Sequence, residues 1–269
     1  MNAKRKIKVV IAAAWWCADR AASLIGIRPD RAGALTVLYY HAVRDGDAIA
    51  FERQLDSIGS YADVVEPDHL GERTGRPKVA ITFDDAFVSA IDNALPPLEA
   101  RKMPVTIFVP TRRLGMHPQW AMEHDATDRE EIVATAESIR ALADRGVRIG
   151  SHSQTHPKMT ALDPRQAAQE LSESKTDLEA LIGGPVDIFA FPYGDFNEAV
   201  VEIARASGYR FVFSTQPGTI DPRDLNILRA RVSTDPSDSP FEFWLKLRGG
   251  YDWMPLASRM KKRLSSMRR

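Results

Sequence analysis

Two aspartates, Asp84 and Asp85, stand side by side at the end of the apolar stretch VAITF, residues 79–83. Adjacent carboxylates repel each other, so something must make the pair tolerable, and a bound cation is one candidate. The apolar stretch is typical of a buried strand, in which neighbouring side chains point to opposite faces. We therefore expect the pair to lie where the strand is already turning, although an aspartate pair alone also fits a simple turn or a helix N-cap.

Two histidines further along the chain could supply the other ligands of a cation. His152 and His156 are four residues apart in SHSQTHP, residues 151–157, and on a helical turn both imidazoles would share one face. Two imidazoles and one carboxylate are a common ligand set for catalytic zinc and leave a position for water. The metal would lower the pKa of that water towards about 7, and the second aspartate could serve as general base. A lone histidine pair also fits a surface or packing pair.

These residues follow short apolar runs that alternate with longer helical patterns. We predict strands at 35–40, 79–83, 105–109, 147–150, 188–191, 211–214 and 227–232, and helices at 51–58, 89–102, 132–144, 164–182 and 197–206. Pro96 and Pro97 are expected to break or restart the second helix, and residues 111–130 are expected to form an inserted loop. The alternation favours βα units, a parallel sheet and a barrel, in which chemistry gathers at the C-terminal ends of the strands.

The length, composition and charge of the chain limit the number of domains and the classes of partner. The chain has 269 residues, enough for one large domain or two small ones, and 44% of them are apolar. The formal net charge is +0, so the total charge gives no indication of a nucleic-acid partner. The basic residues gather at both ends, because residues 1–8 and 256–269 contain lysines and arginines but no acid. The body between them is therefore acidic.

Three motifs in this order resemble those of the polysaccharide deacetylases with a NodB-homology domain, carbohydrate esterase family 4. They are TFDD at 82–85, SHSQTHP at 151–157 and FPYG at 191–194. The resemblance covers residues 35–235 and implies an α/β fold, a distorted (β/α)7 barrel. It also implies metal-dependent removal of N- or O-acetyl groups from glycans. Residues 1–34 and 236–269 would then be basic extensions of the barrel.

The resemblance assigns a role to each motif residue. Asp84 matches the general base, and Asp85, His152 and His156 match the metal ligands, usually for zinc. The same ligand set could accept cobalt, nickel or manganese. Tyr193 matches the residue whose backbone N–H helps to form the oxyanion hole. Its neighbours Phe191 and Pro192 are expected to contribute to substrate binding.

The chain departs from the common family pattern at the acid that must protonate the leaving amine. Most members carry a late leucine-x-histidine motif, but the end strand here reads LRARV at 228–232, and no histidine follows His156. A subgroup of exopolysaccharide and biofilm deacetylases instead has an N-terminal tyrosine-histidine-x-valine motif, which YHAV at 40–43 resembles. We therefore assign the acid to His41. The alternative is a buried histidine hydrogen-bonded to backbone.

Two smaller departures affect the surroundings of the base. Many members have an arginine that orients the base at the start of the third motif, where Ala190 stands here. The residue after the aspartate pair is often glycine, and here it is Ala86. Neither change removes a metal ligand, but both bear on rate and substrate fit.

The chain ends carry further patterns. The apolar run VVIAAAWWCA, residues 9–18, is too short to span a bilayer as a helix. It fits an uncleaved helix on the domain or on a membrane surface better than a cleaved signal or short anchor. Residues 253–267 predict a basic amphipathic helix, packed on the barrel or lying on an anionic membrane. Cys17 is the single cysteine, so no intrachain disulfide can form. We expect a cytoplasmic protein or one peripheral to the inner membrane surface, rather than a secreted or periplasmic one.

The sequence therefore predicts a zinc-dependent deacetylase acting on an acetylated glycan, such as an exopolysaccharide or a chitooligosaccharide. Two other interpretations remain open at this point. One is a deacylase acting on a non-carbohydrate amide. The other is a glycan-binding or assembly protein that has lost turnover, which the missing late histidine and Ala190 favour and the intact motif carboxylates and histidines oppose.

Overall fold

Apolar runs rich in β-branched and aromatic residues form one central sheet. The computed structural model describes residues 3–27, 32–71, 75–122, 127–258 and 260. The strands are β1 (Leu35–Tyr40), β2 (Asp63–Val64), β3 (Lys78–Phe83), β4 (Val105–Val109), β5 (Arg148–Ser151), β6 (Ile188–Ala190), β7 (Phe211–Phe213), β8 (Leu228–Arg229) and β9 (Val232–Ser233). Strands buried on both faces read as continuous apolar runs rather than alternating ones, as in parallel sheets covered by helices.

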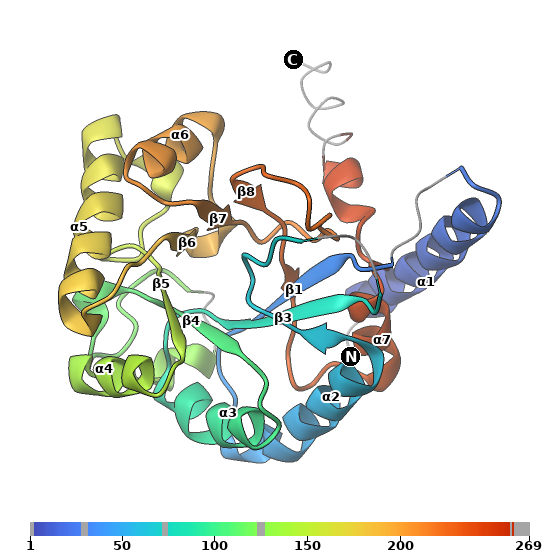
Figure 1. Cartoon of the computed structure of the whole chain (residues 1–269), viewed down its shortest axis with the longest axis horizontal. Coiled ribbons are helices and arrows are strands. Elements are labelled where there is room, and N and C mark those ends of the chain that lie inside the picture. Colours follow the sequence, from blue (N-terminus) through green and yellow to red (C-terminus); the bar gives the residue numbers. More distant parts are fainter. Residues whose placement is uncertain (1–2, 28–31, 72–74, 123–126, 259, 261–269) are drawn as a thin grey trace.

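The sheet is parallel and strongly curled. Its strands are ordered β8-β7-β6-β5-β4-β3-β1-β9, and β2 pairs with β3 off this path. The two edge strands are consecutive in the chain, because β8 ends at Arg229 and β9 begins at Val232. The α/β fold is confirmed as a curled parallel half-barrel of eight strands, and the C-terminal ends of its strands meet at one end (Figure 1).

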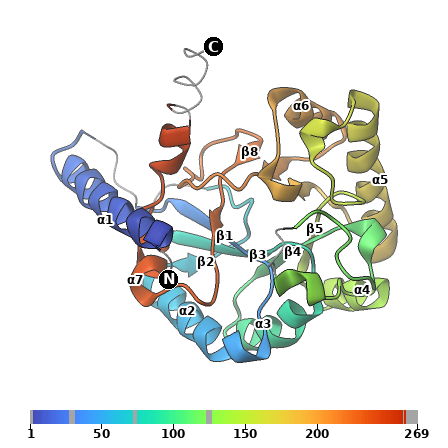
Figure 2. The same cartoon turned by 180° about the vertical axis from the view of Figure 1, so that it is seen from behind.

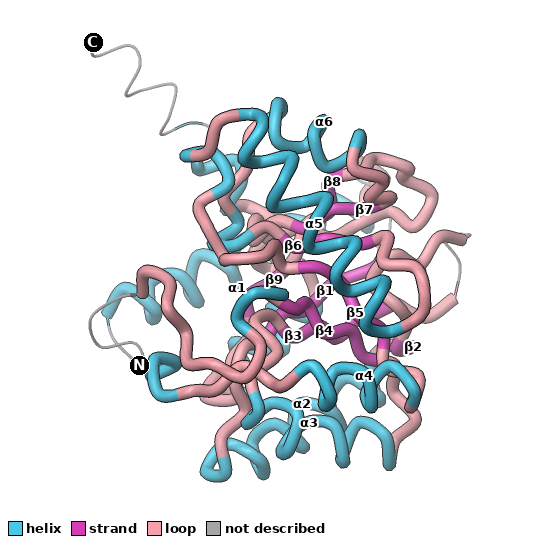
Figure 3. Tube along the Cα trace, turned by 90° about the vertical axis from the view of Figure 1, so that its left-hand side faces the viewer, coloured by secondary structure: helices cyan, strands magenta, loops and turns pink. Residues whose placement is uncertain are grey.

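Helices cover the outside of the curl. They are α2 (Ala48–Tyr61), α3 (Val88–Ala100), α4 (Ala136–Asp144), α5 (Pro164–Ile182) and α6 (Glu198–Ala206). They surround the strands in Figures 1 and 2, and the side view of Figure 3 shows the strands in the centre. The longest of these five, α5, starts at a capping box of Asp163 and Gln166 and stops at Gly183, whose φ of 68° favours glycine.

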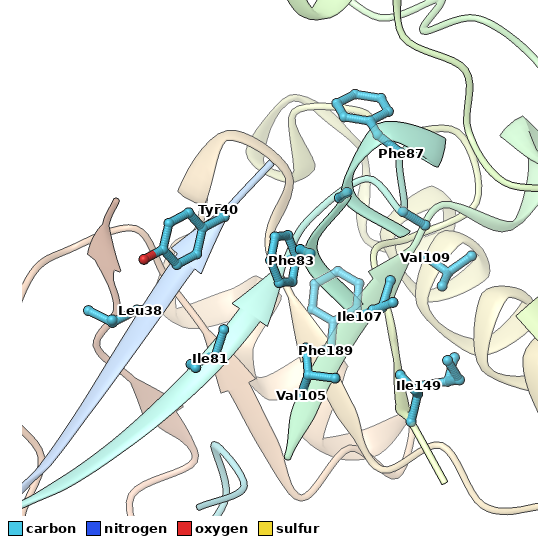
Figure 4. Close-up of a cluster of buried hydrophobic side chains, with 14 of the residues drawn as sticks. Leu38, Tyr40, Ile81, Phe83, Phe87, Val105, Ile107, Val109, Ile149 and Phe189 are labelled. Atoms are coloured by element: carbon cyan, nitrogen blue, oxygen red, sulfur yellow. The ribbon is translucent and has the colours of Figure 1, made fainter. Parts of the chain in front are cut away.

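The core has an outer and an inner layer. The outer layer lies between strands and helices and includes Tyr40, Phe83 and Phe189 (Figure 4). Tyr40 and Phe83 stack with ring centroids 5.4 Å apart. The inner layer fills the curl and includes Phe108 and Phe213, with ring centroids 5.6 Å apart. Burial of both faces holds the strand ends in fixed positions for the site above them.

Three predictions about the helices and strands are wrong beyond small differences at their ends. Helix α3 runs through Pro96 and Pro97 without a break, because Leu95 and Leu98 are buried against the core and tertiary packing outweighs the local cost. The helix predicted from Ile132 begins only at residue 136, after Thr135 caps it. The single strand predicted at 227–232 is divided into β8 and β9.

The N-terminal residues form a long helix, α1 (Ala3–Leu24), which packs on α7 (Pro240–Leu247). Trp16 and Trp244 meet edge to face with centroids 4.6 Å apart, and Val9 and Ala12 are buried against the same cluster. No helix among the described residues is long and apolar enough to cross a membrane. The basic helix predicted at 253–267 lies largely outside the described residues. Within this range, residues 254–258 are described and helical.

Candidate active site

The aspartate pair lies in a turn directly after β3, as predicted. Asp84 remains joined to β1, because its N–H donates to the Tyr40 carbonyl at 2.9 Å. The next two residues leave the strand, since Asp85 has a φ of 67° and Ala86 a φ of 53°. Positive φ is rare for residues other than glycine and clusters at functional sites. The turn separates the two carboxylates, and both are buried.

Asp84 is held by an arginine that sequence reasoning missed. Arg231 lies between β8 and β9 and is fully buried. Its Nη1 donates to Asp84 Oδ1 at 2.6 Å, and its Nη2 donates to Asp84 Oδ2 at 2.8 Å. The Arg231 Nε donates to the Ser214 carbonyl at 3.1 Å, which fixes the guanidinium plane. Such a bidentate pair sets both the charge and the direction of the carboxylate.

The groups around Asp84 keep it ionised. Burial raises the pKa of Asp84, but the charge and hydrogen bonds of Arg231, together with the nearby His152 and His41, outweigh the effect of burial, so the pKa lies below its ordinary value. Asp84 is therefore a carboxylate at neutral pH. Each of its oxygens accepts one bond from Arg231 and keeps a second lone pair available for another donor.

The two histidines lie in a loop after β5 rather than on the helical turn that their spacing suggested. Ser153 has a φ of 65° and His156 a φ of 62°, both incompatible with a right-handed helix. The loop is held by Glu170 of α5, whose Oε2 accepts the N–H groups of Gln154 at 2.8 Å and Thr155 at 3.0 Å. His156 N–H donates to Ser153 Oγ at 3.0 Å. Helix α5 thus fixes the histidine positions from outside the cleft.

Asp85, His152 and His156 converge as the sequence predicts for a metal site. Their nearest ligand atoms lie within 4.8 Å of one another, and all three residues are buried. The Nε2 atoms of His152 and His156 lie 3.5 and 3.3 Å from Asp85 Oδ1. That oxygen is buried and has no hydrogen-bond partner in the described part of the chain. A buried carboxylate oxygen facing two imidazoles suits a divalent cation, so the donor set fits zinc or a similar ion.

The protonation states agree with a cation site. Burial alone raises the pKa of Asp85, but contact with His156 and then the influence of His152 lower it to about 2. Burial lowers the pKa of His152 to about 4. A neutral His152 donates its Nδ1–H to the Ala190 carbonyl at 2.8 Å. The Nε2 lone pair therefore faces Asp85, which is the orientation that a metal ligand needs.

All six predicted catalytic and metal-binding residues line one cleft at the C-terminal ends of the strands. The cleft has a volume of about 670 Å³, and these residues are His41, Asp84, Asp85, His152, His156 and Tyr193. His41 follows β1 and contacts Tyr39 edge to face, with centroids 5.7 Å apart. The rim includes Trp120, which stacks on the His156 ring at 4.3 Å between centroids. Trp120 falls within the predicted inserted loop, and its part in the cleft had no signal in the sequence.

The FPYG segment presents Tyr193 and buries its neighbours. Tyr193 has a φ of 58° and contacts the His156 ring edge to face at 4.7 Å between centroids. Phe191 and Pro192 are buried and are not among the cleft-lining residues. Gly194 follows at a φ of 62°, and a Cβ there would lie 1.9 Å from Thr215 Oγ1. Phe191 and Pro192 therefore support the Tyr193 turn from the buried side.

The geometry combines three capabilities in one cleft. Asp84 is an ionised, oriented carboxylate, and it adjoins a site where Asp85 and the two histidines could hold a cation. His41 faces the same space and can donate or accept a proton. The signal that could have revealed Arg231 was an arginine between two short strands at the end of the predicted sheet.

Comparison with known proteins agrees with this arrangement. The family model described as polysaccharide deacetylase matches residues 71–212, which is more than half of the chain. The chain is 26% identical to YxkH of Bacillus subtilis over 235 residues, covering 82% of this chain and 79% of that protein. It is also 26% identical to a chitooligosaccharide deacetylase of Rhizobium leguminosarum over 159 residues, covering 57% of this chain and 60% of the relative.

Solved structures share the fold. IcaB from Ammonifex degensii superposes with a TM-score of 0.68 at 24% identity, covering 81% of this chain and 97% of that structure. The deacetylase PplD of Streptococcus pyogenes superposes with a TM-score of 0.66 at 19% identity, covering 80% and 98%. At these identities the likeness shows the half-barrel fold alone.

Proposed function

Because the chain belongs to the polysaccharide deacetylase family, we propose that it is a divalent-metal-dependent hydrolase that removes acetyl groups from a glycan. The observation that carries the proposal is the buried cluster of Asp85, His152 and His156 beside an ionised Asp84. We propose zinc as the metal, with cobalt, nickel or manganese as alternatives, and N-acetyl groups as the preferred target. The glycan would be an exopolysaccharide or a chitooligosaccharide, and the similarity to the Rhizobium chitooligosaccharide deacetylase supports the latter.

The chain's own residues account for the proton transfers. A cation held by Asp85, His152 and His156 supplies Lewis acidity towards the acetyl carbonyl and the attacking water. Asp84 accepts a proton from the water that attacks the acetyl carbon, and Arg231 keeps this carboxylate ionised and aimed.

The remaining groups act on the carbonyl oxygen and on the leaving group. We assign the Tyr193 backbone N–H to the oxyanion that develops on the carbonyl oxygen. His41 donates a proton to the sugar nitrogen as the carbon–nitrogen bond breaks, which releases acetate and a free amine. Phe191 and Pro192 hold the Tyr193 turn, so their role in substrate binding is indirect.

The test is acetate release by purified protein from a panel of N- and O-acetylated oligosaccharides. The protein is first treated with a chelator and then reloaded with zinc. We expect acetate release to disappear on chelation and to return with zinc. Stoichiometric zinc binding without acetate from any glycan would contradict the proposal, and would favour a glycan-binding protein without turnover or a deacylase for other amides.

We also propose peripheral contact between α1 and an anionic membrane on the cytoplasmic side. Ile7, Val10 and Ile11 are exposed at helical spacing on α1, and Lys4 and Lys6 are exposed nearby. Apolar side chains bordered by lysines suit the membrane interface. Flotation with phosphatidylglycerol vesicles tests this location, and equal binding by wild type and an Ile7→Ser/Val10→Ser variant would remove its basis.

A further inference from the structure

A second hollow adjoins the cleft beside α1. The second hollow has a volume of about 640 Å³ and shares two lining residues, Tyr39 and Thr215, with the cleft. Residues of α1 and α7 contribute to its wall, and the two helices pack against each other near the N-terminal end of α1 (Figures 1 and 2). Helix α1 lies outside the segment matched by the family model, so this wall belongs to the extension of this chain.

Most charges in the wall of the hollow neutralise one another. Arg5 donates to Glu242 at 2.8 Å and to Asp238 at 2.5 Å. Lys246 donates to Asp238 at 2.6 Å. Two cations and two carboxylates therefore form a closed network that ties α1 to α7 and leaves no net charge for a ligand.

Two lysines in the same wall are not part of this network. Lys4 and Lys8 line the hollow and are exposed, and neither has an ion-pair partner among the described residues. Asp235 is the one lining carboxylate outside the network, and its Oδ1 accepts the Ser237 N–H. The hollow therefore carries a surplus of positive charge.

A further cation lines the cleft itself. Lys158 lines the cleft with its ammonium 5.9 Å from the centroid of the Tyr193 ring. It too has no ion-pair partner in the described part of the chain. The carboxylate of Asp128, on the same cleft, is by contrast already paired with Arg44 at 2.6 Å. Ammonium groups without an ion-pair partner among the described residues thus line both the cleft and the hollow.

We propose that the cleft and the hollow form one groove for an acidic glycan. The acetylated sugar lies at Asp84, and an anionic substituent of a neighbouring sugar, a carboxylate or a phosphate, lies at Lys4 and Lys8. This inference rests on the proposed deacetylase function and narrows its substrate class. Unpaired ammonium groups at a binding groove favour an anionic partner by attraction during encounter and by charge-assisted hydrogen bonds in the complex.

The experiment compares two oligosaccharides of equal length on the zinc-loaded protein. One is a neutral oligomer of N-acetylglucosamine, and the other alternates N-acetylglucosamine with glucuronic acid. Binding is measured by calorimetry at low salt, and acetate release is measured in parallel. The test variant is Lys4→Gln/Lys8→Gln. The matched control is Lys6→Gln/Lys102→Gln, which removes the same total charge from exposed lysines that do not line the hollow.

The proposal predicts that wild type prefers the acidic oligomer in binding. The test variant should reduce that preference about five- to tenfold, and the matched control should keep it. The preference of wild type for the acidic oligomer should shrink at about 1 M salt, where charges are screened within about 3 Å. Equal binding of both oligomers by wild type would overturn the proposal, and so would equal losses in the two variants.

Two further outcomes separate this proposal from others. If neither oligomer releases acetate but the binding preference depends on Lys4 and Lys8, the deacetylase function fails and the acidic groove stands. If the three lysines of α1 contribute equally to phosphatidylglycerol vesicle binding and none affects the oligomers, the charge serves a membrane and the groove proposal is overturned.

Discussion

Asp84 and the arginine that neutralises it are 147 positions apart in the chain. Their bidentate pair explains how adjacent aspartates coexist at the end of β3. Arg231 neutralises the charge of Asp84, whereas Asp85 faces two histidines with which it could hold a cation. The two carboxylates thus have different partners, although they are neighbours in sequence, and such different surroundings suit different tasks.

Replacement of Arg231 by methionine should move the pH dependence of catalysis. Burial alone raises the pKa of Asp84, so without the guanidinium this pKa rises and the acid limb of the kcat profile shifts to higher pH. At neutral pH we expect kcat to fall by about 10²-fold or more, because the base becomes largely protonated. Lysine at this position should retain part of the activity. Zinc stoichiometry serves as the control and should be unchanged.

The same pair should stabilise the fold in a defined pH range. The pKa of folded Asp84 lies below its unfolded value of about 3.9, so the pair stabilises the fold above about pH 4. This contribution is lost as the pH falls through the folded pKa. Urea unfolding should therefore show Arg231→Met destabilised by about 3–5 kcal/mol at pH 7. A difference of the same size at pH 3 would contradict this account.

Substitution of each aspartate by asparagine should have a different effect on acetate release and on zinc binding. Asp84→Asn removes the base and should abolish acetate release while the protein still binds zinc at one equivalent. Asp85→Asn removes a ligand and should weaken zinc binding itself. Both substitutions have the same size and remove the same charge, so each controls for the other. Full zinc binding in both variants would show that the cation site is assigned to the wrong residues.

At the scale of elements, several residues of the candidate site lie in short turns rather than in helices or strands. Asp85, His156 and Tyr193 all have positive φ, and each follows a strand of the curled sheet. Such backbone is costly for residues with a Cβ and persists only where the surroundings enforce it. Here Glu170 of α5 and the buried Phe191 provide that support.

Gly194→Ala should disturb catalysis through the turn that carries Tyr193. A Cβ at Gly194 would meet Thr215 Oγ1 at 1.9 Å, so the turn or Thr215 must move. We expect kcat/KM to fall about 10²-fold with zinc binding retained, since a shift of about 1 Å has effects of this size. Gly183→Ala is the matched control, because it has a similar φ of 68° and nothing within 4 Å of the added Cβ. Equal activity in the two variants would argue against a role for this turn.

The sequence predicted the fold class and the six cleft residues because both depend on local patterns. Strand ends in a parallel sheet meet at one edge, so motifs at 84–85 and 152–156 had to converge. Arg231 could not be predicted in this way, because its partner depends on how strongly the sheet curls. The continuous α3 also escaped prediction, since the burial of Leu95 and Leu98 outweighs the local effect of two prolines.

At the scale of the whole molecule, metal binding should contribute to stability. A ligand that binds only the folded state stabilises it by about 2.7 kcal/mol when its free concentration is 100 times Kd. For a chain of this length we expect chelation to lower the Tm by roughly 5–10 °C. Differential scanning fluorimetry with and without zinc measures the shift. Asp85→Asn should show little response to zinc, and an equal response in this variant would place the stabilising metal elsewhere.

The position of Arg231 between β8 and β9 has a consequence for biosynthesis. On the ribosome, Asp84 is made long before Arg231, and β1 finds its partner β9 only when the residues after Ala230 have emerged. Until then Asp84 lacks its arginine and would carry an uncompensated charge into the core. The pairing of β9 with β1 adds the last strand at this edge of the sheet and brings Arg231 to Asp84 in one event. A nascent chain therefore acquires the compensated Asp84 carboxylate only when the last strand of the half-barrel has been added.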